Sequence, residues 1–315
     1  MSQYIIRRFL MVIVILWCIS LVVFFVTEIL PGDTATFILG QRATPENLAA
    51  IRNQLGLNQP LHQRYIAWIT GLLQGDWGNS LLLKMPVLPI LTDRLYNTAI
   101  LAGLALLVGI PLGISLGIIA GLKRGSWLDQ LILMVTMLAV SLPSFVIAIF
   151  LVIIFAAWLQ WLPASSLVSG QANLVDNITV LILPTLTLVF EMLAHIARHT
   201  RSSLIEVLDS DYLRTAKSKG LFQHLIILRH ALPNALLPTI SVIALNVGWL
   251  LSGAVLVETV FAYPGLGRLL LQAISSRDIP LLQAITLVMA TAFTLANLAA
   301  DLLYRWLNPK IRYGS

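Results

Sequence analysis

The amino-acid sequence predicts an all-α membrane protein that crosses the bilayer with six transmembrane helices. Of its 315 residues, 58% are hydrophobic and only 11% are Asp, Glu, Lys or Arg, whereas about 25% of residues are charged in an ordinary soluble domain. The charges gather between long uncharged runs, because a charge at the middle of a spanning helix costs roughly 2.5–3.5 kcal/mol. A spanning helix needs roughly 20 residues, and we find six such stretches.

The first span lies in residues 1–30, where the uncharged run Phe9–Thr27 follows two arginines. A cleaved signal peptide is the alternative, but Glu28 and Pro31 stand where a small-residue cleavage site would be needed. We therefore expect a retained helix. The single cysteine, Cys18, lies in this run, which excludes a disulfide framework and a cysteine-based metal site.

Residues 31–95 form the predicted outer insert, which would be periplasmic or extracellular. Thr44 is placed to cap a helix, Pro45 suits its first position, and Gly56 suits its end. A second amphipathic stretch follows, with an apolar face formed by Leu61, Tyr65, Trp68, Ile69 and Leu72. So few apolar side chains predict a small cap rather than a catalytic domain.

The remaining spans belong to a transmembrane core at residues 96–307, followed by a cytoplasmic tail at 308–315. The expected helices are about 97–122, 131–162, 178–198, 235–257 and 280–304. The second of these five is predicted to be one long helix bent near Pro143, because the residues after Leu162 are typical of a loop.

The distribution of basic residues predicts that both termini are cytoplasmic. Six spans place the termini on one side, which then receives thirteen Lys and Arg against seven on the other. Five of those seven lie in the long insert, which largely escapes the positive-inside rule. The excess of Lys and Arg behind the net charge of +6 is explained by the positive-inside rule. We therefore expect no nucleic-acid partner.

The cytoplasmic loop 201–234 is predicted to contain a short helix from Asp211 to Lys219. Lys217 and Lys219 lie at its negative end, and Gly220 suits a left-handed stop. Tyr212, Leu213 and Ala216 share one face of this helix, while Arg214 and Lys217 point elsewhere. Two interpretations stay open from these residues alone. The helix either rests on the membrane surface or projects and docks into a partner protein.

The stretch from Asp211 to Gly220, followed by His230-Ala-Leu232-Pro233, resembles the cytoplasmic loop of ABC importer permeases. It is most similar to the B-type subunit of the dipeptide, oligopeptide and nickel permease family, and further landmarks of that family occur in order along the chain. They are Pro31–Asp33, Leu55–Leu61, Gly75–Ser80, Ser141–Ser144, Glu258–Arg268 and Asp301–Tyr304. Arg214-Thr215-Ala216 replaces the Glu-Ala-Ala of the general pattern, a departure that this subfamily shares.

The resemblance implies a type I ABC importer permease fold in the bacterial inner membrane. It implies a second homologous permease as heterodimer partner, two cytoplasmic ATPases and an external binding protein that delivers a peptide or related solute. It also implies an ATPase-coupling loop formed by Asp211, Tyr212, Leu213, Arg214, Thr215, Ala216, Lys217, Lys219, Gly220, Leu232 and Pro233. Because the chain has no P-loop motif, we expect a non-catalytic subunit without a cofactor, with ATP and Mg²⁺ on the partners.

Three further features could carry function. Glu191 is an acid within a span, either lining the translocation path or serving as a structural group. His195 and His199 have metal-ligand spacing, but without a carboxylate-rich shell we expect packing or headgroup contact and no metal. Asn177-Ile-Thr179 matches a glycosylation acceptor by chance. The rival functions are a self-sufficient secondary transporter or channel and, less well supported, a membrane-embedded enzyme.

Overall fold

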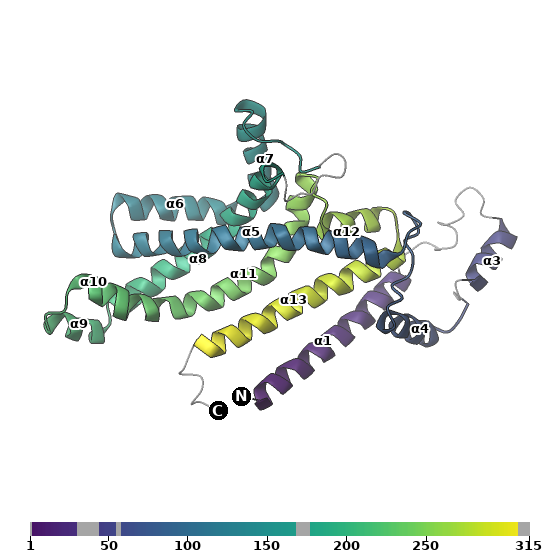
Figure 1. The fold of residues 1–315 in the computed structure, drawn as a ribbon, viewed down its shortest axis with the longest axis horizontal. Coiled ribbons are helices and arrows are strands. Elements are labelled where there is room, and N and C mark those ends of the chain that lie inside the picture. The colour runs from purple at the N-terminus through teal and green to yellow at the C-terminus, as the bar shows by residue number, and fades with distance from the viewer. Residues whose placement is uncertain (1, 30–43, 55–57, 168–176, 308–315) are drawn as a thin grey trace. The chain divides into compact units, whose positions relative to one another are not determined.

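The computed structural model describes residues 2–29, 44–54, 58–167 and 177–307. Over these residues the chain is helical, with a single isolated β-bridge between Asn79 and Pro86 and no strand (Figure 1). The chain divides into two compact units, which are described separately. Unit 1 comprises Met1–Asn97 and Gly265–Thr294, and unit 2 comprises Thr98–Pro264 and Leu295–Ser315.

Unit 1 contains the first span and the helices of the insert. Its elements are α1 (Ser2–Ile29), α3 (Pro45–Gln54), α4 (Leu61–Leu73), α12 (Leu266–Ser275) and the first parts of α5 (Val87–Leu122) and α13 (Ile279–Leu307). The Thr44 hydroxyl accepts a hydrogen bond from the Asn47 amide at 3.3 Å, which confirms the predicted cap of α3. The predicted end of that helix at Gly56 lies outside the described residues.

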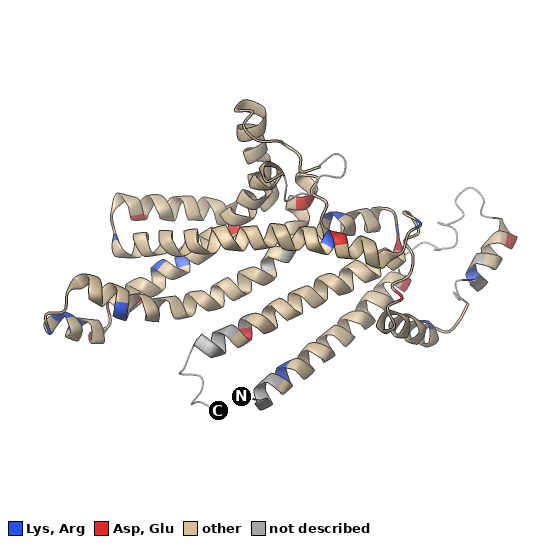
Figure 2. Ribbon diagram, viewed as in Figure 1, with Lys and Arg blue, Asp and Glu red and all other residues tan. Residues whose placement is uncertain are grey.

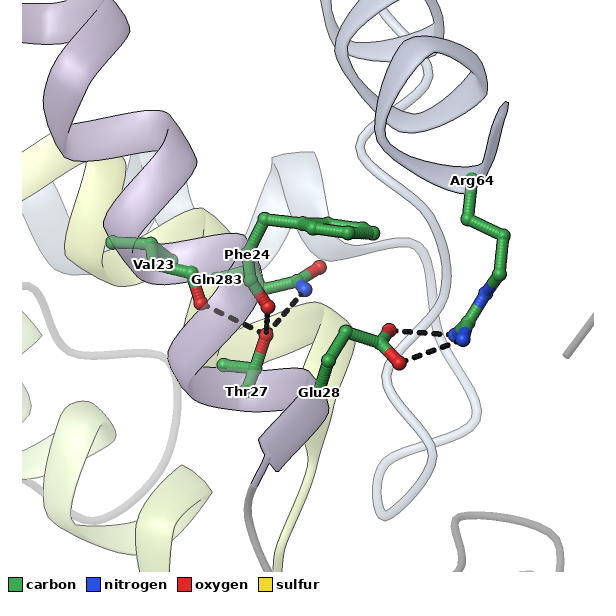
Figure 3. A network of polar contacts seen from close by, with 6 residues as sticks. All are labelled: Val23, Phe24, Thr27, Glu28, Arg64 and Gln283. Atoms are coloured by element: carbon green, nitrogen blue, oxygen red, sulfur yellow. Dashed lines mark hydrogen bonds and ion pairs between the residues drawn. The ribbon is translucent and has the colours of Figure 1, made fainter. Parts of the chain in front are cut away.

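The helix α4 is tied to α1 by a charged pair and by aromatic contacts. Arg64 donates two hydrogen bonds of 2.6 Å to the Glu28 carboxylate (Figure 3), and both side chains are largely buried. The Phe24 ring lies 5.5 Å from the Tyr65 ring and 5.6 Å from the Trp68 ring. The predicted apolar face of α4 therefore contacts the first span through Tyr65 and Trp68.

Polar contacts also join the start of α13 to other parts of unit 1. The Gln283 amide donates to the Thr27 hydroxyl at 2.7 Å (Figure 3). Asp278 is fully buried and accepts hydrogen bonds from the Ser80 hydroxyl and from the Leu82 and Leu281 amides. The Asp278 carboxylate thus caps α13 and fixes the turn before α5.

Unit 2 holds the longer part of the transmembrane core. Its elements are α6 (Trp127–Ser141), α7 (Ser144–Leu151), η2 (Val152–Trp158), α8 (Thr179–Leu208), α9 (Asp211–Ser218), α10 (Gln223–Leu225), η4 (Ile226–Ala231), α11 (Leu232–Val260) and the rest of α5 and α13. Within the described residues, five helices are long and apolar enough to cross a membrane, and there are six if the bent pair α6 and α7–η2 forms one span. The prediction of six spans agrees with the larger number.

The bend predicted within 131–162 lies beside Pro143 as expected, but α6 and α7 are two separate helices and not one continuous helix. The two segments differ in direction by 110°. Leu142 has the extended dihedral angles φ −97° and ψ 132°, as expected of a residue whose helical conformation the following proline ring disfavours. Pro143 itself cannot donate the backbone hydrogen bond that would continue α6.

Two predicted helix boundaries near the cytoplasmic loop also need correction. The helix expected at 178–198 continues to Leu208. Arg201 and Leu204 explain the extension, because the first pairs with α6 and the second is fully buried. The helix expected to start at 235 is preceded without a break by α10 and η4.

A row of glycines brings α5 and α8 into close contact. Four glycines spaced four residues apart face four α8 side chains with the same spacing: Gly109 with Met192, Gly113 with Ile196, Gly117 with Thr200 and Gly121 with Leu204. A methyl group added at Gly117 would lie 2.5 Å from the Thr200 Cβ and 2.7 Å from the Ala197 carbonyl oxygen. This glycine row lets the two helices approach as small-residue stripes do in membranes.

Candidate functional site

The helix α9 lies where α8 turns into α11, in a segment that we call the α9 corner (residues 209–235). Leu213 is 3% exposed and packs in an apolar cluster with Leu204 of α8, Ile226 of η4 and Ala235 of α11. One buried side chain therefore connects the short helix to both long helices.

Both ends of α9 follow the predicted pattern. Asp211 lies in its first turn and Lys217 in its last, as the helix dipole favours. Gly220 has the positive φ of +77°, its amide donates to the Lys217 carbonyl at 3.0 Å, and the Leu221 amide donates to the Ala216 carbonyl at 3.4 Å. These two bonds form a Schellman motif, which confirms the predicted left-handed stop.

A small polar network fixes α9 to the start of α11. The Tyr212 hydroxyl donates to the His230 carbonyl at 3.4 Å and accepts from the Asn234 amide at 3.2 Å. Asn234 also donates to the His230 carbonyl at 2.8 Å. The sequence placed Tyr212 on the same face as Leu213, but it gave no sign of Asn234, whose role depends on the distance across the turn.

The α9 corner carries several Lys and Arg residues (Figure 2), and exposed apolar side chains lie beside them in the chain. Arg214, Lys217 and Lys219 are exposed, with Arg214 in a weak 3.5 Å ion pair to Asp211. The apolar side chains beside them are unusually open, since Phe222 is 69% exposed and Leu228 is 63% exposed. Apolar side chains this open are typical of a surface that contacts another protein or a membrane.

Of the other predicted coupling residues, Thr215 is exposed, and Leu232 at the start of α11 packs against the apolar cluster around Leu213. Pro233 follows it at the surface. The structure thus places all of the predicted coupling residues in one corner of unit 2.

An ion pair that the sequence analysis missed lies between α6 and α8. Arg201 donates to both oxygens of Asp129 at 2.6 and 2.8 Å, and Asp129 is only 2% exposed. The Gly125 amide adds a third hydrogen bond to Asp129 at 2.9 Å. The sequence offered only an acid at the start of an apolar stretch, and its need for a partner becomes clear only from its burial.

The predicted path and metal candidates all lie on or beside α8. Glu191 is half-buried and makes no hydrogen bond or ion pair with any residue that the structure describes. His195 and His199 are one turn apart, and the described part of the chain contains no group of three or more His, Cys, Asp or Glu arranged to hold a metal ion. Asn177 is exposed just before α8 begins.

Comparison with known proteins places these features in a family. The chain matches the family described as "Binding-protein-dependent transport system inner membrane component" over residues 113–313 and the N-terminal part described for such membrane components over residues 1–102. Together the two matches cover both units.

Curated relatives match the chain along almost its whole length. It is 39% identical over 333 residues to a dipeptide transport system permease of Alkalihalophilus pseudofirmus and 37% identical over 313 residues to a probable peptide ABC transporter permease of Sinorhizobium fredii. It is 38% identical over 313 residues to a glutathione transport system permease of Salmonella typhimurium. Each match covers 99% of this chain and 100% of the relative.

A solved structure supports the fold. An inward-facing form of the MetNI methionine ABC transporter contains a chain that is similar at a TM-score of 0.54, with 14% sequence identity, over 70% of this chain and 97% of that one. The all-helical architecture, the extent of the family match and the curated relatives agree with one another. The chain therefore belongs to the family of binding-protein-dependent transport system inner membrane components, and it is a multi-pass permease subunit of an ABC importer in the bacterial inner membrane.

Proposed function

We propose that this chain is a non-catalytic permease subunit that carries short peptides, and that the α9 corner couples it to cytoplasmic ATPases. The solute class is supported by its relatives, which are named as permeases for peptides, dipeptides and glutathione. The exposed basic and apolar surface of the α9 corner supports the coupling role.

The attachment of α9 is the observation that carries the coupling proposal. Leu213 and the Tyr212 network hold α9 against α8 and α11, while its outer face stays open for a partner. A force applied to that face is therefore transmitted to two long helices. A helix that only rested on lipid headgroups would need no such connection to both of them.

The proposal includes partners that this chain does not contain. A second homologous permease completes a heterodimer, two ATPase subunits bind ATP and Mg²⁺, and an external binding protein delivers the solute. Both termini lie in the cytoplasm, so that the α9 corner faces the ATPases, as the distribution of basic residues favours.

The rival function from the sequence, a self-sufficient secondary transporter or channel, does not agree with the family match, because that family works with a binding protein.

The test replaces Gly220 with Val and compares it with Gly125→Val. Both glycines have positive φ, +77° and +79°, and neither has an atom within 4 Å of an added Cβ, so the backbone cost of about 1–2 kcal/mol is matched. We expect Gly220→Val to reach the membrane but to lose most peptide uptake per ATP hydrolysed, because the end of α9 is reshaped. Uptake and ATP hydrolysis are measured in vesicles that contain the assembled importer.

Gly125→Val should keep its coupling, because Gly125 lies in the turn between α5 and α6. Gly220→Asn should restore coupling, since asparagine adopts positive φ at lower cost. Coupled uptake that persists in Gly220→Val would overturn the docking role of α9.

A further inference from the structure

The second half of α8 has a polar face that the described residues of unit 2 leave partly open. From Glu191 onwards, the side chains that share this face are half-buried or exposed, and nearly all are polar: Glu191, His195, Arg198, His199, Ser202 and Glu206. The opposite face is the buried ridge that packs on the glycine row of α5. Because an α-helix has 3.6 residues per turn, the residues of these two sets project from opposite sides of α8.

Glu191 stands out among the acids of the long helices. Other acids that are buried or half-buried there have a partner: Glu28 with Arg64, Asp129 with Arg201, and Glu258 with Thr98. Glu191 lies far from both ends of α8, and it has no hydrogen bond or ion pair within the described part of the chain. In the membrane this carboxylate needs polar surroundings, because contact with lipid would cost roughly 2.5–3.5 kcal/mol for a central carboxylate. Water or a ligand in the transport path would supply such surroundings.

We propose that this polar face lines the aqueous path of the importer, and that Glu191 is a binding site there for the positively charged amino group of the cargo. The proposal rests on the permease function and deepens it by naming a recognition group within the path. A carboxylate beside low-dielectric walls attracts cations more strongly than one in open water.

The spacing of charges on the face suits a short peptide that carries both a positive and a negative end. Arg198 follows Glu191 by seven residues, which is about 10 Å along the helix axis. An extended peptide spans at most about 3.3–3.6 Å per residue, so roughly two or three residues bridge that distance. The amino end would then meet Glu191 while the carboxylate lies near Arg198.

The test uses thiol chemistry and needs no knowledge of the cargo. Cys18 is the only cysteine, so Cys18→Ser gives a background in which His195→Cys places one thiol a turn away from Glu191. In the assembled importer without ATP, we expect this thiol to react with charged methanethiosulfonate reagents. Leu107→Cys, at an apolar position of α5 that is 72% exposed, should react much more slowly if it faces lipid.

The role of Glu191 is measured by the preference between a cationic and an anionic reagent. Removing its charge with Glu191→Gln should reduce the cationic preference at position 195 by about fivefold or more, whereas Glu191→Asp should keep it. Asp93→Asn, which removes an exposed acid near the start of α5, should leave the ratio unchanged.

Two results would overturn the inference. An unreactive thiol at position 195 would show that the face is dry, and an unchanged ratio in Glu191→Gln would show that Glu191 attracts no cation. Neither result depends on α9 or on ATP, so the docking role of the α9 corner is judged separately by the Gly220 variants. Protection of the thiol by dialanine, but not by N-acetyl-dialanine, would extend the assignment to peptide amino groups, and equal protection by both would overturn that assignment.

Discussion

The contact between α5 and α8 and the attachment of α9 hold α8 in two different ways. Along α5, four glycines admit four α8 side chains, and a single added methyl group at Gly117 would collide with backbone and side-chain atoms. At the other end, α9 is held by one buried leucine and a few hydrogen bonds. The comparison indicates that close backbone approach fixes α8 against α5 over several turns, whereas α9 is attached to α8 and α11 mainly through Leu213 and a few hydrogen bonds.

The largest effect is expected for Leu213→Ala, which removes the buried side chain that attaches α9 to α8 and α11. Removing this buried side chain should cost α9 about 2–5 kcal/mol of local stability, because the cavity lies between three helices. Amide hydrogen exchange in residues 211–218 should rise accordingly, and coupled uptake should fall. Leu107→Ala, which truncates an exposed leucine of α5, serves as the control. Unchanged protection of α9 would show that its attachment does not depend on Leu213.

A smaller but still clear effect is expected in the glycine row. Gly117→Ala should destabilise the subunit by about 1–3 kcal/mol, because Thr200 and the Ala197 carbonyl cannot both move away. Gly103→Ala has no atom within 4 Å of the new methyl group, and it should be neutral or stabilising by up to about 1 kcal/mol, since alanine favours helix. The melting temperature of the purified subunit measures both. Equal behaviour of the two variants would mean that the close contact is not maintained in the membrane.

The smallest effect is expected for Tyr212→Phe. It removes the hydroxyl that bonds to His230 and Asn234 but keeps the direct bond between those two residues. The loss should lie near the lower end of about 0.5–1.5 kcal/mol, because Tyr212 is partly exposed to water. Uptake should fall by less than the loss seen with Leu213→Ala. A larger fall would place the hydroxyl in contact with the ATPase itself.

The sequence predicted the features whose signals are local. The bounds of α9 and the conformation of Gly220 follow from residues within one turn of each other, so they could be read directly. The family also followed, because the motif at Asp211–Gly220 occurs together with an ordered set of further landmarks along the chain.

Features that depend on distant partners could not be predicted in the same way. The extension of α8 to Leu208 depends on Asp129, which is far away in sequence. Pro143 was recognised as a bend, but the 110° change of direction depends on how α7 packs. The glycines of α5 did carry a signal in their four-residue spacing, which is typical of close helix contact, yet the sequence does not say that α8 is the partner.

The glycine row also constrains how this protein can diverge. An alanine at position 109 would press on the terminal methyl of Met192, a flexible group that can rotate aside or be exchanged for a shorter side chain. An alanine at position 117 would press on the main chain at Ala197, and no exchange of side chains relieves that pressure. In the course of evolution, Gly109 can therefore be replaced if Met192 changes as well. Gly117 must remain glycine, because no change of a neighbouring side chain makes room for a Cβ there.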